Sequence, residues 1–83
     1  MTIKTIKTND IEANRIIENK TRFIFRSDRD FFKEGDIIEF RVIKDGKEVI
    51  HKINSKRYVV TAVMDCMTAP IEKGFLFIAF RAL

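Results

Sequence analysis

The sequence has very little of the residue types that build disulfide frameworks, metal sites and flexible linkers. Its 83 residues include one cysteine, one histidine, one proline, three glycines and no tryptophan. The single cysteine, Cys66, cannot form an internal disulfide, and no Cys-x-x-Cys pair is present that would favour zinc. We therefore expect a domain that needs no metal or cofactor and folds in a reducing compartment.

Long hydrophobic runs are also missing. The longest, Phe75 to Phe80, has six residues, whereas a membrane-spanning helix needs roughly 20. Residues 1–7 alternate apolar and polar or charged side chains and lack the continuous apolar stretch of a signal peptide. These absences predict a protein that is neither membrane-bound nor secreted, and we expect it in the cytoplasm or, in a eukaryote, the nucleus.

Length and composition predict one globular domain spanning residues 1–83. The chain is 46% hydrophobic and 34% charged, which is not the composition of a disordered protein. A domain this small buries only about 60% of the surface that its unfolded chain exposes, so one core needs nearly all the large apolar side chains. The net charge of +4 favours approach to polyanions without identifying one.

The N-terminal part of the sequence predicts a strand followed by a helix. Alternation over residues 2–7 is typical of a short edge strand. Asn9 followed three residues later by Glu12 is a variant of the capping box, and it predicts a helix over residues 10–18. Asn19 can end that helix because asparagine tolerates the left-handed backbone conformation.

After the helix the hydrophobic period becomes two, which predicts a second strand. Arg22, Ile24 and Arg26 would face one way, and Phe23 and Phe25 the other. Because large aromatic side chains are needed in a small core, we expect both phenylalanines to be buried.

The pattern of the remaining sequence predicts further strands. Residues 37–43 form the clearest alternation, and Asp45-Gly46 suits the type I′ turn of a hairpin. Residues 58–63 and 75–80 are continuous β-favouring runs, expected of strands covered on both faces, with a loop over 65–74 between them. The sequence therefore predicts a mostly β (α+β) fold: a small barrel of about five to six mainly antiparallel strands with one N-terminal helix.

Three motifs in this order resemble the ASCH (activating signal cointegrator homology) family of the PUA-like superfamily of small β-barrels. They are Asn19-Lys20-Thr21 after the helix, the Asp-Arg-Asp-Phe element at 28–31 followed by Glu34-Gly35-Asp36, and the closing strand from Lys73 to Ile78. The middle motif is similar to a bacterial and phage branch of uncharacterised function. The resemblance covers most of residues 11–80.

The resemblance implies an RNA-binding cleft in which Lys20 and Thr21 match the family's Lys-Thr. The family has a polar residue and an arginine at the positions that hold Phe23 and Phe25 here. A shift of one residue would instead make Arg26 the strand arginine, and the sequence leaves both alignments open.

A basic cluster interleaved with phenylalanines also favours nucleic-acid binding. Arginine contacts phosphate bidentately, and aromatic faces stack on bases. We expect Lys20 and Arg22 to contact phosphate, Arg26 or Arg29 to clamp a base or a second phosphate, and Tyr58 to offer a stacking face. The predicted RNA- or nucleotide-binding residues are thus Lys20, Thr21, Arg22, Arg26, Arg29 and Tyr58.

Two other functions remain open. Some small members of the family resemble amidases that cleave N4-acylated cytidine, which would make Lys20 catalytic, although Glu72 is the only glutamate in the region where those members carry theirs. A protein-interaction domain with a coactivator-like role would instead show a broad apolar patch, for example around Ile71 and Leu83.

Four further side chains have structural interpretations. Asp28 and Asp30 flank Arg29, and we expect their carboxylates to fix the loop through hydrogen bonds. We expect His51 to be an exposed strand residue. Cys66, which lies between Met64 and Met67, is expected to pack as a small hydrophobic side chain rather than act as a nucleophile.

Overall fold

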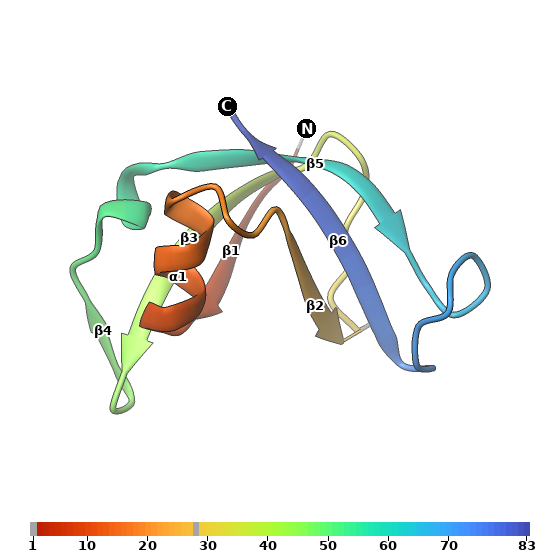
Figure 1. Ribbon diagram of the computed structural model, residues 1–83, viewed down its shortest axis with the longest axis horizontal. Coiled ribbons are helices and arrows are strands. Elements are labelled where there is room, and N and C mark those ends of the chain that lie inside the picture. Colours follow the sequence, from red (N-terminus) through yellow and green to blue (C-terminus); the bar gives the residue numbers. More distant parts are fainter. Residues whose placement is uncertain (1, 28) are drawn as a thin grey trace.

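The chain folds into one six-stranded sheet with a single α-helix, as a computed structural model shows (Figure 1). The structure describes residues 2–27 and 29–83. The elements are β1 (Ile3–Thr8), α1 (Asp10–Ile17), β2 (Phe23–Ser27), β3 (Ile37–Lys44), β4 (Lys47–Val49), the 3-10 helix η1 (Lys52–Ser55), β5 (Arg57–Met64) and β6 (Phe75–Ala82). The strand order is β1-β3-β5-β6-β2, with β4 paired to β3.

Helix α1 forms where the capping pattern predicts it. The Asn9 side chain accepts a hydrogen bond from the Glu12 N–H, and Asn19 adopts the left-handed conformation with φ 61°. The helix is one residue shorter than predicted. Neither α1 nor any other helix in the described part of the chain is long and apolar enough to cross a membrane.

Most strand pairs are antiparallel, as the sequence predicts. The β3–β4 hairpin turns at Asp45 and Gly46, whose φ values of 52° and 76° are those of a type I′ turn. The β3–β5, β5–β6 and β2–β6 pairs are also antiparallel, whereas β1 lies parallel to β3. The predicted edge strand at the N-terminus is confirmed, because β1 ends the sheet.

The core lies between one face of the sheet and α1. Phe40, Tyr58 and Phe80 come from three neighbouring strands, and their rings pack together with centroids 5.3–5.6 Å apart. Helix α1 contributes Ala13 and Ile16 to the same cluster. This aromatic centre draws on strands that are adjacent in the sheet but distant in sequence, so the core fixes the sheet order.

The sheet is not closed into a barrel, which corrects that part of the prediction. Strands β1 and β2 are its two ends, and among the described residues no backbone ladder joins them. A side chain spans the opening instead, because the Arg26 guanidinium donates to the Lys7 carbonyl oxygen at 3.3 Å. We call the opening between these two strands the seam.

The predicted burial of Phe23 and Phe25 is also wrong. Both rings are exposed on the outer face of β2. The reason is that α1 packs on the opposite, inner face, where Ile24 is buried, and no other helix of the described chain covers the outer face. Strand β6 is likewise covered on one face and not on both, since Ile78 is buried whereas Phe75 is exposed.

Candidate functional site

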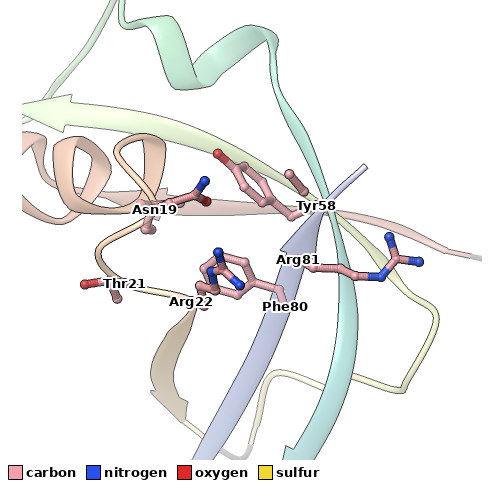
Figure 2. A pocket seen from close by; sticks show the side chains of 8 residues that line it. Asn19, Thr21, Arg22, Tyr58, Phe80 and Arg81 are labelled. Carbon is pink, nitrogen blue, oxygen red and sulfur yellow. The ribbon is translucent and has the colours of Figure 1, made fainter.

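A cavity of about 180 Å³ lies where α1 leads into β2, against the ends of β5 and β6. The left-handed turn at Asn19 reverses the chain, and the N–H groups of Lys20 and Thr21 both donate to the Arg15 carbonyl oxygen, at 2.9 and 3.2 Å. These bonds hold the connecting segment in place beside the sheet. Six of the lining residues are labelled in Figure 2: Asn19, Thr21, Arg22, Tyr58, Phe80 and Arg81.

Two aromatic side chains form the inner wall of this cavity. Tyr58 packs edge-to-face against Phe80, with ring centroids 5.3 Å apart. Burial raises the pKa of the Tyr58 hydroxyl above its usual 10.0, because the tyrosinate anion is poorly solvated there. Like that of any tyrosine, the hydroxyl is protonated at neutral pH, so it can donate a hydrogen bond to a ligand, and burial extends this state further into the alkaline range.

Two arginines and one threonine lie at the mouth of the cavity. Figure 2 shows the Arg22 side chain beside the Phe80 ring, while the Arg81 guanidinium points away from the cavity. Both arginines are exposed, and neither forms an ion pair with another residue of the described ranges. The Thr21 hydroxyl accepts a hydrogen bond from Arg15 Nε at 3.1 Å, which brings a third cation to the mouth.

Lys20 does not line this cavity. Its ammonium forms an ion pair with Glu18 at 3.1 Å, and its side chain is 60% exposed. The structure therefore brings Thr21, Arg22 and Tyr58 together and leaves the predicted cleft lysine on the surface next to them.

The other two predicted arginines lie at the opposite end of β2, on the seam. Arg26 donates to Glu12 Oε1 at 3.0 Å, to the Lys7 carbonyl oxygen and to its own neighbour's carbonyl, and its side chain is only 23% exposed. Arg29 joins Arg26 in lining a second, wider concavity of about 630 Å³ along β1. The predicted binding residues are thus divided between two sites.

The seam concavity combines cations with aromatic rings. Lys4 and Lys7 line it from β1, and the Lys4 ammonium lies 5.0 Å from the centre of the Phe32 ring. Asp30 also lines it, but its carboxylate accepts no hydrogen bond from the described residues, so the predicted side-chain role is wrong; the backbone N–H of Asp30 instead donates to the Ser27 carbonyl oxygen at 3.1 Å. Asp28, for which a similar loop role is predicted, lies outside the described residues.

The single histidine and the single cysteine do not form a shared site. His51 precedes η1 and caps it, since its Nδ1 accepts from the Ile53 N–H at 3.1 Å and its Nε2 lies 2.7 Å from Asn14 Oδ1. It is a half-buried cap, which corrects the expectation of an exposed strand residue. Cys66 is exposed, so its predicted packing as a small hydrophobic residue is wrong.

The exposed phenylalanines on the outer face were not among the predicted site residues. Phe25 lies opposite Phe77 in the β2–β6 ladder, and Ser27 lies opposite Phe75. The sequence does contain a pattern that indicates this face, since phenylalanine occupies alternate positions in two segments, 23 and 25 in one and 75 and 77 in the other. Only the strand register shows that these positions share one face.

A scan against models of known protein families and a search of curated proteins found no match to this chain. The geometry of the site therefore carries the functional argument.

Proposed function

We propose that the protein is a small RNA- or nucleotide-binding module and that the cavity at the start of β2 receives one nucleotide. The observation that carries the proposal is that Thr21 and Arg22 meet Tyr58, from a distant strand, around one concavity with Arg81 at its rim. An unpaired guanidinium suits a phosphate, while a protonated hydroxyl and an aromatic edge suit a base or a ribose.

The size of the cavity limits what enters it. Sites for drug-sized molecules usually measure about 300–1,000 Å³, and this one measures about 180 Å³. One base or one phosphate group fits such a space, and the rest of a nucleotide would lie along the rim beside Arg22. The binding mode is therefore a shallow clamp rather than complete enclosure.

Membership of the ASCH family is part of the same proposal. It is supported by the order of the motifs and by a fold with one helix between the first two strands of a mostly antiparallel sheet. The open seam between β1 and β2 differs from the closed barrel that the resemblance implies.

The geometry favours binding over amide hydrolysis. An amidohydrolase using Lys20 would need the ammonium inside a cavity with a positioned carboxylate. Lys20 instead pairs with Glu18 on the surface, and Glu72 lies in the loop before β6 rather than at the cavity.

The test is a fluorescence anisotropy titration of labelled single-stranded RNA, matched DNA and hairpin RNA at two salt concentrations. For Arg22→Met we expect about tenfold weaker RNA binding, because a charge-assisted hydrogen bond contributes ~1.5 kcal/mol. We also expect the salt dependence to fall by roughly one phosphate contact.

The matched control is Lys47→Met, which removes the same charge at the exposed β3–β4 turn, away from the cavity. It should leave RNA affinity within about twofold of the wild type, apart from a small general charge effect. Equal losses for both variants would show that binding depends on net charge alone and that the cavity is not the site.

A further inference from the structure

The outer face of β2 and β6 is a continuous aromatic surface. Side chains alternate along each strand, so Phe23, Phe25, Phe75 and Phe77 all point away from the core. Phe23 and Phe77 stack with centroids 5.1 Å apart, and Phe25 packs its edge against both rings at 5.9 and 5.5 Å. We call these four residues the phenylalanine face.

Three of the four rings of this face remain accessible. Phe23 is 43%, Phe25 50% and Phe75 45% exposed. On a sheet face that meets only water, the outward side chains are normally polar, whereas here the outward positions of both strands are mostly aromatic. Exposed aromatic clusters of this kind mark binding surfaces.

The phenylalanine face begins beside the proposed nucleotide cavity. Thr21 lines that cavity and also a groove of about 450 Å³ between α1 and β2, which includes Phe23 and Phe25. Phe25 in turn lines a further hollow of about 280 Å³ with Pro70 and Phe75. The cavity and the groove thus share Thr21, and the groove and the hollow share Phe25, so the three concavities follow one another along β2; we call this series the track.

The charges beside this track suit a polyanion. Arg15 lines the groove and contacts Thr21 at its junction with the cavity, and Arg22 lies at the cavity itself. On β6, the outward positions 75, 77, 79 and 81 place Arg81 at the cavity end of the aromatic row. Two carboxylates line the track: Glu12 in the groove is already paired with Arg26, and Glu72 lies in the hollow at the end farthest from the cavity.

The track is long enough for more than one nucleotide. β2 has five residues, and a strand rises about 3.3 Å per residue, so its outer face spans roughly 13 Å. RNA-binding sheets of other proteins stack two or three bases on aromatic side chains.

From these observations we propose that the phenylalanine face is a base-stacking platform for single-stranded nucleic acid, extending from the nucleotide held in the cavity. This inference rests on the proposed function, since the cavity supplies the first contact. Bases stack on Phe23, Phe25 and Phe75, Arg15 and Arg81 contact the phosphates between them, and Arg22 contacts the phosphate of the nucleotide in the cavity. Binding to the platform is not sequence-specific, because every base presents a face that can stack on an aromatic ring.

Because the chain contains no tryptophan, a single introduced tryptophan reports directly on base stacking. Phe25→Trp introduces a single indole on the platform, and its fluorescence should be quenched by an eight-nucleotide oligouridylate. An abasic oligomer of equal length carries the same phosphates without bases and should leave the fluorescence unchanged. Quenching by neither oligomer, or equally by both, would overturn the stacking proposal.

Affinity measurements separate the platform from the cavity. Phe25→Leu keeps an apolar side chain but removes the ring, and it should weaken oligouridylate binding about tenfold while leaving uridine monophosphate affinity unchanged. Phe31→Leu is the control, because Phe31 is 77% exposed and lies on the seam instead. Arg22→Met should weaken the binding of both ligands.

The failures of the two proposals are distinguishable. If Arg22→Met weakens monophosphate binding but Phe25→Leu leaves oligouridylate binding unchanged, the platform is wrong and the cavity stands. If the wild type binds neither ligand, both fail. If sedimentation shows a wild-type dimer that Phe25→Leu converts to a monomer, the face is a contact between two copies of the chain and the stacking proposal is overturned.

Discussion

Arg22 and Arg26 face the same side of the sheet from opposite ends of β2, with the buried Ile24 between them, yet their surroundings differ completely. Arg26 makes three hydrogen bonds and spans the seam to β1 and α1. Arg22 is exposed at the cavity and pairs with no carboxylate of the described chain. The difference arises from what lies beside each arginine: helix α1 with its Glu12 and the free edge of β1 beside Arg26, and an open concavity beside Arg22.

An arginine in a basic cluster thus has a structural role or is free to contact a ligand, depending on its neighbours. Arg26 is held because Glu12 offers a carboxylate that the Thr8 hydroxyl also contacts. A ligand phosphate would have to compete with Glu12 for that guanidinium. Arg22 has no such competitor in the described chain, so its charge is available.

The largest expected effect is on stability. Arg26→Met should lower the free energy of unfolding by about 2 kcal/mol, because it removes charge-assisted hydrogen bonds across the seam and leaves Glu12 without its cation. Arg22→Met should change it by less than about 0.5 kcal/mol, as expected of an exposed side chain. Urea unfolding of both variants measures the difference through the midpoint and slope.

A double-mutant cycle is the control for that comparison. Combining Arg26→Met with Glu12→Gln should cost less than the sum of the single changes, by roughly 1 kcal/mol, because the two side chains interact directly. Additive effects would mean that the interaction between Arg26 and Glu12 does not contribute to the free energy of unfolding. Equal destabilisation by Arg22→Met and Arg26→Met would remove the distinction between the two ends of β2.

A smaller effect on the free energy of unfolding should appear at high pH, and it comes from Tyr58 at the cavity. Because the pKa of Tyr58 is raised in the folded protein, the folded state keeps its proton at a pH where the unfolded chain has lost it. Stability linked to this group is full below pH 10.0 and falls as pH rises through the raised pKa. Tyr58→Phe should therefore lose less stability than the wild type between neutral pH and pH values above 10.

The measurement compares urea midpoints of the wild type and Tyr58→Phe across this range. Tyr58 is the only tyrosine of the chain, so the ultraviolet absorbance of tyrosinate also reports its titration directly. Parallel pH profiles for the two proteins would contradict the link between burial and the Tyr58 pKa.

Local patterns predicted the elements well, because their causes lie within a few residues. The Asn9 cap, the left-handed Asn19 and the Asp45-Gly46 turn each follow from one side chain or one dihedral preference. The alternation that separates Arg22 and Arg26 from the phenylalanines was equally visible in the sequence.

What could not be predicted depends on contacts between distant strands. Whether Phe25 is buried depends on the face that α1 covers, and the role of Arg26 depends on Glu12 and Lys7 lying beside it. Whether the sheet closes likewise depends on the distance between the edges of β1 and β2, which the hydrophobic period of neither strand determines. The sequence therefore identified a basic, aromatic strand but could not divide its residues between structure and site.

The smallest expected effect on stability and RNA affinity is that of Lys20→Met. It tests most directly whether the binding site lies in the cavity or on the surface beside it. Although Lys20 adjoins Thr21 in sequence, its ammonium is paired with Glu18 outside the cavity. An exposed ion pair of this kind contributes little, so Lys20→Met should change neither the free energy of unfolding by more than about 0.5 kcal/mol nor RNA affinity by more than about twofold. Anisotropy titrations beside Arg22→Met measure this directly. A loss at Lys20 that equals the loss at Arg22 would move the phosphate contact from the cavity mouth to the end of α1, where the resemblance to the ASCH family places it.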